Sequence, residues 1–196
     1  MLNTALAIIQ DEHRSLAAVI HGLRYIVREL SRQSMAPDFS LLGAMVHYIG
    51  AYTGTLHHPK EEQYIFSALR SRTKEADDVI DTLERQHGEG AGDFARLSEA
   101  LRSYREGSHD GLRQFSSAVE TLADNAWKHM GLEENLLIPL AKQYLSGNDW
   151  VEIAQAFSAN GDPRFSVEHD QQFRDLFSRI VNLAPPPIGV GPAVRF

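Results

Sequence analysis

Two segments of this chain repeat one pattern, HHPKEEQYI at residues 57–65 and HMGLEENLL at residues 129–137. In each segment the first histidine is followed, four residues later, by the first of two adjacent glutamates. The pairs are His57 with Glu61 and His129 with Glu133. A spacing of four places both side chains on one face of an α-helix, where they can reach one metal centre. A single pair arises by chance on many helices, but two matching pairs predict a site shared by two helices.

Two further stretches have helical periodicity and carry one histidine each within an apolar stripe. In the first stretch, His13 lies among apolar residues spaced alternately four and three apart between Ile9 and Leu30. In the other, which starts at Ile80, His87 has the same position. Such a stripe is typical of a helix that turns one face toward a core. The sequence therefore predicts four long helices, each with a histidine on its inner face.

The segments between these helices are short and lie near residues 35–38, 71–75 and 106–110. Short connections are typical of antiparallel neighbours in a bundle. We therefore expect an all-α fold, an up-down-up-down four-helix bundle at residues 1–145. We expect residues 146–196 to form a C-terminal helical extension and a Pro/Gly-rich tail within the same domain.

The composition excludes several classes of site and partner. The 196-residue chain has no cysteine, so a metal must be held by His, Asp or Glu, and disulfides and iron–sulfur clusters are excluded. A formal net charge of -7 argues against a nucleic-acid partner. No apolar run approaches the roughly 20 residues that a membrane span needs, and the amino terminus has no secretory signal. We expect a soluble, cytoplasmic protein without a membrane partner, and the sequence does not identify a protein partner.

The types of candidate ligand select the metal. Four imidazoles and two carboxylates without a thiolate suit iron or manganese. Two carboxylates from different helices can each bridge a pair of ions in a bundle core. A single zinc ion is less suitable because it takes about four ligands, whereas six converge here. Without a metal, burying these groups would cost several kcal/mol for each ionised group that lacked a partner.

At these residues the chain resembles the hemerythrin-like, or HHE cation-binding, domains, over residues 1 to about 155. The resemblance rests on four motifs, Asp11-Glu12-His13, His57-His58-x-x-Glu61-Glu62, Glu84-x-x-His87, and His129-x-x-x-Glu133-Glu134 with Leu137-Ile138-Pro139-Leu140. It implies a hemerythrin-like bundle with two iron ions between its helices. The implied ligands are the imidazoles of His13, His57, His87 and His129 and the bridging carboxylates of Glu61 and Glu133.

The resemblance also indicates which function to expect. Oxygen-carrying hemerythrins have a second histidine four residues after the third-helix ligand, and Ala91 stands at that position here. A set of four His and two Glu is more similar to the bacterial di-iron proteins linked to iron–sulfur cluster repair and nitric oxide, or to iron-sensing relatives. We therefore expect a non-heme di-iron protein that binds or senses O2, NO or iron.

The alternative function is a di-iron redox enzyme that reduces peroxide or oxidises a small substrate, so the sequence leaves open whether the chain is an enzyme. A substrate-sized tunnel, or a carboxylate or tyrosine placed to shuttle protons, would favour the enzyme. A pocket only large enough for a diatomic ligand would favour the binder or sensor.

Two assignments remain open within this prediction. His58 and Glu62 are also four residues apart, and their helix face is a plausible core face; we prefer His57 with Glu61 because the repeat aligns them with the second pair. Pro59 is expected to bend this helix nearby. In the extension, His169 is either a fifth imidazole for the site or an ordinary surface residue, and the second interpretation is favoured.

Overall fold

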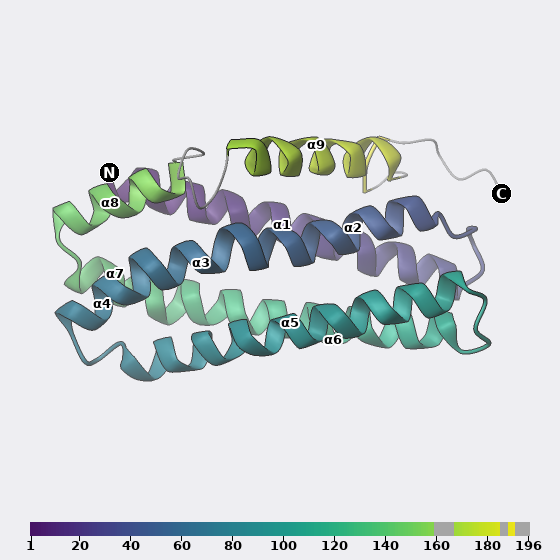
Figure 1. Cartoon of the computed structure of the whole chain (residues 1–196), viewed down its shortest axis with the longest axis horizontal. Coiled ribbons are helices and arrows are strands. Elements are labelled where there is room, and N and C mark those ends of the chain that lie inside the picture. The colour runs from purple at the N-terminus through teal and green to yellow at the C-terminus, as the bar shows by residue number, and fades with distance from the viewer. Residues whose placement is uncertain (159–166, 185–187, 191–196) are drawn as a thin grey trace.

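A computed structural model describes the backbone of residues 1–158, 167–184 and 188–190, and the side chains of these residues except for 167–174. The described residues are helical and contain no strand. Four long helical rods run antiparallel to one another and form the body of the molecule (Figure 1). The predicted four-helix bundle is confirmed.

The rods differ in their regularity. The first is α1 (Leu2–Ser31) and the third is α5 (Asp77–Arg105). The second consists of α2 (Phe39–Tyr52), η1 (Thr53–His57), α3 (His58–Lys60), η2 (Glu61–Phe66) and α4 (Ser67–Arg72). The fourth consists of α6 (Gly111–Leu132), η3 (Glu133–Leu137) and α7 (Ile138–Tyr144). The η segments are π-helical, and they occur where the two repeated motifs lie.

The π-helical segments are defined by backbone bonds that reach five residues back. The N–H groups of His58, Ser67 and Ile138 donate to the carbonyls of Thr53, Glu62 and Glu133, respectively. Pro59 has no N–H, and its ring disfavours the ordinary α-helical bond to the residue four positions earlier. The rod therefore passes through Pro59 with a local change of helix type. Single π-helical turns within α-helices are frequent at functional sites.

Local signals set the ends of the rods. The Asp38 carboxylate accepts hydrogen bonds from the N–H groups of Ser40 and Leu41, at 2.9 and 3.0 Å, and so caps the start of α2. Gly107 follows the end of α5 with a φ of 82°, a left-handed conformation that glycine adopts at little cost. The helices therefore end at the short connections that the sequence predicted.

The apolar core is divided into two clusters along the bundle. One cluster includes Leu16, Leu23, Met45, Leu97 and Phe115. The other includes Ile9, Ile65, Leu83, Leu137 and Trp150. Every rod contributes to both clusters, and on each rod a histidine or glutamate lies between the two contributions. A polar layer therefore crosses the bundle between two apolar halves.

The C-terminal extension packs onto the outside of the bundle. Helix α8 (Gly147–Ser158) lies against α1 and buries Trp150, Ile153 and Phe157 in the second cluster. Helix α9 (Val167–Leu183) lies along α2 (Figure 1). The boundary between bundle and extension at residue 145 stays a prediction. The assignment of both parts to one domain also stays a prediction. The His169 side chain and the proline triplet at 185–187 lie outside the described residues.

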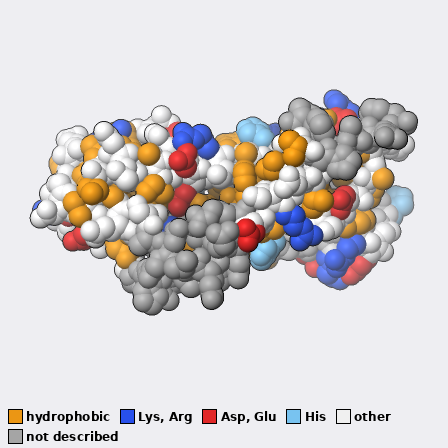
Figure 2. Space-filling view, turned by 90° about the horizontal axis from the view of Figure 1, so that it is seen from above, with side chains coloured by type: hydrophobic (Ala, Val, Ile, Leu, Met, Phe, Trp, Pro, Cys, Tyr) orange, Lys and Arg blue, Asp and Glu red, His pale blue; other side chains and the backbone are white. Residues whose placement is uncertain are grey.

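The surface seen from the α9 side has basic and acidic side chains beside one another among the residues drawn in colour (Figure 2). This view therefore does not show a surface dominated by one charge. Among the described residues, the helices that are long enough to cross a bilayer are too polar to do so.

A substitution in α8 tests whether the extension completes the core. Ile153→Ala removes a side chain that is 1% exposed, and we expect it to lower the free energy of unfolding by about 2–4 kcal/mol. Gln155→Ala, on the exposed face of the same helix, should change it by less than about 0.5 kcal/mol. Thermal and urea unfolding of the full chain measure both values. Equal effects of the two substitutions would contradict the packing of α8.

Candidate metal centre

The polar layer contains, among the described residues, two groups of side chains that could hold a metal ion. The two-histidine cluster consists of His13, His57, Glu61 and Glu133. The three-histidine cluster consists of His58, Glu61, His87 and His129. Within each cluster the candidate ligand atoms lie within 4.8 Å of one another. All four rods contribute, so the site forms only when the bundle has assembled.

The two glutamates span both clusters. Glu61 places Oε1 3.4 Å from Nε2 of His57 and Oε2 3.6 Å from Nε2 of His87. Glu133 places Oε2 3.1 Å from Nε2 of His13 and Oε1 2.9 Å from Nε2 of His129. Each carboxylate therefore directs one oxygen to each cluster, which is how a carboxylate bridges two metal ions in a bundle core.

Several buried atoms of the site lack the partners that a protein core normally supplies. When the facing imidazoles carry no proton on Nε2, Oε2 of Glu61 and both carboxylate oxygens of Glu133 have no hydrogen-bond donor among the described residues. Both side chains are almost fully buried, at 1% exposure. Leaving buried charged oxygens unpaired is strongly unfavourable. A cation between the carboxylates would satisfy these oxygens, so the residues present fit a metal.

The imidazoles lead to the same conclusion. Nε2 of His13 lies 3.1 Å from Nε2 of His57, and Nε2 of His87 lies 3.3 Å from Nε2 of His129. A neutral imidazole that carries its proton on Nδ1 has a lone pair on Nε2. Two such lone pairs repel at this distance unless a proton or a metal ion lies between them. The converging nitrogens are therefore arranged as ligands.

Each of these four imidazoles has an acceptor on its other nitrogen, which keeps the proton on Nδ1. The Nδ1 contacts are His13 with Glu134 at 3.2 Å, His57 with Glu12 at 2.7 Å, His87 with Glu62 at 2.7 Å, and His129 with Gln86 at 2.9 Å. Such partners fix the tautomer and ring orientation of metal-binding histidines. They turn Nε2 toward the centre of the bundle.

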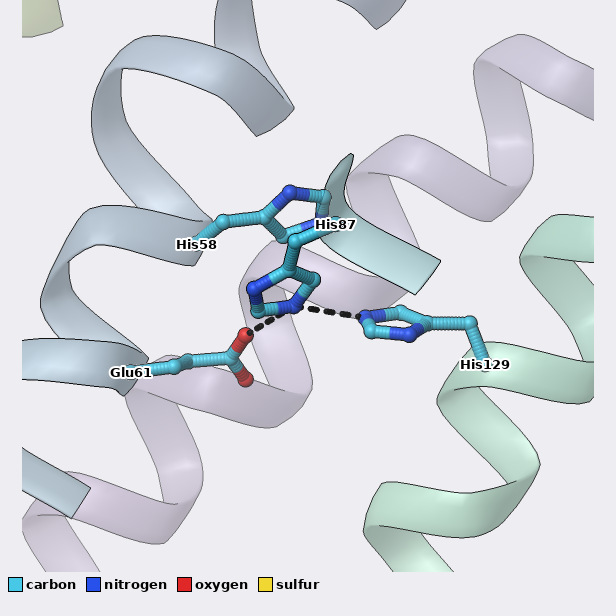
Figure 3. Close-up of side chains that lie close together, drawn as sticks. All are labelled: His58, Glu61, His87 and His129. Atoms are coloured by element: carbon cyan, nitrogen blue, oxygen red, sulfur yellow. Dashed lines mark hydrogen bonds and ion pairs between the residues drawn. The ribbon is translucent and has the colours of Figure 1, made fainter. Parts of the chain in front are cut away.

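His58 joins the site through its ring contacts. Its ring stacks on that of His87, with centroids 3.8 Å apart and an angle of 7° between the planes (Figure 3). The view also shows Glu61 below this stack and His129 opposite it, on the fourth rod. Burial, together with the neighbouring imidazoles of His87 and His57, lowers the pKa of His58 to about 2. His58 is therefore neutral at physiological pH, the form that binds metals.

The two buried carboxyls have opposite proton affinities in the absence of a cation. Burial and the facing Glu133 carboxylate raise the pKa of Glu61 well above its usual value. Burial acts in the same direction on Glu133, but the imidazoles of His129 and His13 outweigh it and hold the Glu133 pKa well below its usual value. Despite burial, Glu133 and Glu134 raise the pKa of His13. Protons on Glu61 and His13 therefore take the place that a metal cation would fill.

The extension covers the two-histidine cluster. The Phe157 ring on α8 lies edge-on to the His57 ring, with 6.5 Å between centroids. Lys60 is buried beneath it, with Nζ 5.2 Å from the Phe157 centroid and 3.4 Å from Oε1 of Glu12. Glu12 in turn accepts from His57. This contact chain shields the two-histidine side from solvent and connects α8 to the site.

The opposite side of the site is open. A cavity of about 450 Å³ reaches His58, His87 and His129, and it extends between all four rods. The three-histidine cluster is therefore the side from which a small molecule can approach.

All six residues predicted as ligands meet in the polar layer. The sequence alone makes His58 with Glu62 an alternative to His57 with Glu61, whereas the structure brings both histidines to the site. Glu62 is 47% exposed and contacts the outer nitrogen of His87. The adjacent histidines before Pro59 were the available signal, since a proline there disturbs regular helical geometry. Which of these residues bind metal stays a prediction.

Three matched substitutions test whether each histidine of the second rod contributes to metal binding. Because the two histidines belong to different clusters, His57→Ala and His58→Ala should each weaken one metal site at least about tenfold in affinity. His47→Ala, at an exposed position on the same rod, should leave metal content unchanged. Metal titrations with elemental analysis measure these effects. If His58→Ala kept its full metal content, His57 would be the only histidine of the second rod assigned as a metal ligand.

Glu61→Gln tests the electrostatic role of the buried carboxyl. Because the Glu61 pKa is raised in the folded state, folding takes up a proton, and the stability of the metal-free protein falls as pH rises above 4.5 toward that raised value. The neutral amide needs no proton to be buried, so it removes this loss of stability. We expect Glu61→Gln to stabilise the metal-free protein by on the order of 1 kcal/mol at pH 7, with a smaller gain at pH 5.

The same variant should lose the stabilisation that added metal gives to the parent protein. Thermal melts at the two pH values, with and without metal, measure these effects; a destabilised metal-free variant would contradict this account.

Comparison with known proteins is consistent with this site. The family model described as hemerythrin HHE cation binding domain matches residues 4–141, which include every residue of both clusters. A comparison with individual curated proteins found no match. The matched region is most of the chain and carries the buried His and Glu clusters that a cation would need. The chain therefore belongs to the hemerythrin HHE cation-binding domain family.

Proposed function

We propose that this chain is a non-heme di-iron protein that binds or senses O2, NO or iron at a centre bridged by Glu61 and Glu133. The observation that carries the proposal is the position of the two buried carboxylates, each with one oxygen at each histidine cluster. This arrangement supports two ions rather than one. The proposed ligands are the six predicted from the sequence together with His58.

The donor set favours iron over the alternatives. Five imidazoles and two carboxylates provide nitrogen and oxygen donors in a chain without cysteine. Imidazole suits iron, whereas manganese and magnesium prefer sites dominated by carboxylate and water. Zinc takes about four ligands and gains little from two bridging carboxylates. Manganese remains the metal that would compete most closely.

The protein side chains determine what the centre can do. Glu12, Glu62 and Glu134 hold imidazoles in fixed orientations, and the apolar clusters on both sides keep bulk water away. His58, His87 and His129, with one oxygen each of Glu61 and Glu133, would hold an ion at the three-histidine cluster. Bound iron would supply electrons and a binding position to O2, NO or peroxide.

One observation supports the second candidate function, a di-iron redox enzyme. The cavity of about 450 Å³ reaches the three-histidine cluster. Pockets for substrates and cofactors commonly have about 300–1,000 Å³, far more than a diatomic ligand requires. A substrate could therefore lie beside the metal centre.

Iron analysis tests the proposed function. After anaerobic iron loading we expect about two ions per chain, because each bridging carboxylate serves two positions. Optical spectra of the reduced protein should change on exposure to O2, NO or H2O2, and repeated turnover of H2O2 would identify the enzyme. Glu61→Gln serves as the control without a complete bridge. One ion or none per chain would contradict the proposal.

A further inference from the structure

The cavity at the three-histidine cluster has mostly apolar walls. Side chains from the first, second, third and fourth rods line it, including Leu16, Ile49, Phe94, Leu122 and Met130. His58, His87 and His129 form its polar wall. The lining therefore combines one metal-binding surface with walls that are mostly, though not entirely, apolar.

The size of the cavity indicates the size of its occupant. A cavity of about 150 Å³ lined by apolar side chains binds benzene, and one water molecule takes about 30 Å³ of liquid. The volume of about 450 Å³ is three times that of the benzene-binding cavity. In proportion, it suits an organic molecule of roughly ten to twenty non-hydrogen atoms. O2 or NO alone would leave most of it unfilled.

The charged side chains that line the cavity have partners on the protein or are exposed to solvent, so none is left to pair with a charged occupant. Arg85 pairs with Glu89 at 3.0 Å, and Asn125 donates to Asp93 at 2.8 Å. Asp93 also pairs with Arg96, and Lys128, the remaining charged residue of the lining, is exposed to solvent. Transferring an ionised group into the apolar interior would therefore be unfavourable.

Glycines shape the cavity in two ways. At Gly50 an added Cβ would lie 2.1 Å from the Phe94 ring, so this glycine lets the ring close against the second rod. At Gly90 an added Cβ would meet no heavy atom within 4 Å. Gly90 lies three residues after His87 and four before Phe94, so all three share one face of α5. A side chain at this position would enter the cavity.

We propose that the cavity binds an uncharged, mainly apolar organic molecule with one hydroxyl or carbonyl group directed at the three-histidine cluster. The position of the polar group rests on the proposed metal centre, since a metal ion there accepts an oxygen donor. The apolar part of the molecule is held by the walls between the rods.

Calorimetric titration of the metal-loaded protein under anaerobic conditions tests the ligand class. The probes are 2-naphthol, which is neutral, and naphthalene-2-sulfonate, a charged analogue of similar size whose sulfonate is a weak metal ligand. We expect one 2-naphthol per chain and at least tenfold weaker binding of naphthalene-2-sulfonate. Equal affinities, or no binding of 2-naphthol, would overturn the proposal.

Matched glycine substitutions locate the binding site. Gly90→Leu should weaken 2-naphthol binding at least tenfold, whereas Gly88→Leu should leave it unchanged. Gly88 also has open space around an added Cβ, but it does not line the cavity. Both substitutions raise helix propensity equally, so a difference in 2-naphthol affinity between the two variants reports on the cavity. Ala126→Leu, from the opposite wall, provides a second cavity variant if Gly90→Leu does not fold.

Metal analysis of each variant separates this inference from the proposed function. Unchanged metal content with weaker 2-naphthol binding in the cavity variants supports the binding site. Unchanged 2-naphthol binding in a folded cavity variant would overturn it. A parent protein that takes up no metal would contradict the proposed function, and the comparison of Gly90→Leu with Gly88→Leu would still decide whether the cavity binds the probe.

Discussion

Two carboxylates buried face to face between four helices are the constraint on which the structure depends. Glu61 and Glu133 lie in the layer that separates the two apolar clusters, and their charges repel in a region that excludes water. Protons can relieve this repulsion, as the raised pKa of Glu61 indicates, and so can a cation. The surrounding imidazoles converge on the same space with their Nε2 atoms. The bundle therefore gains stability from a cation that only the assembled fold can hold.

The second and fourth rods both contain π-helical segments at this polar layer. In a regular α-helix, His57 and His58 would be separated by about 100° around the axis and would face different neighbours. In the structure, where η1 ends at His57 and α3 begins at His58, the two histidines likewise face different neighbours, and one belongs to each cluster. The fourth rod has a π-helical segment at its repeated glutamates as well, from Glu133 to Leu137. Departures from regular geometry thus accompany the ligands.

The two sides of the site have different surroundings. Helix α8 covers the two-histidine side through Phe157, and the buried Lys60 and Glu12 connect it to His57. The three-histidine side faces the cavity. This asymmetry is the physical basis for placing ligand approach at one cluster and structural support at the other. It also gives the extension a role near the site that the bundle alone could not supply.

The sequence alone determined the four helices, their antiparallel order and the inward faces of His13, His87 and His129, because these depend on local periodicity and spacing. The spacing between His57 and Glu61 also follows from one regular helix face. Only the tertiary structure decided that His58 joins the site. Its place in the site depends on which neighbouring rods meet the two faces of the second rod, and a pattern read from one helix does not give this. The cavity is likewise a tertiary property, since its walls come from rods far apart in sequence and its volume is what their packed side chains leave unfilled.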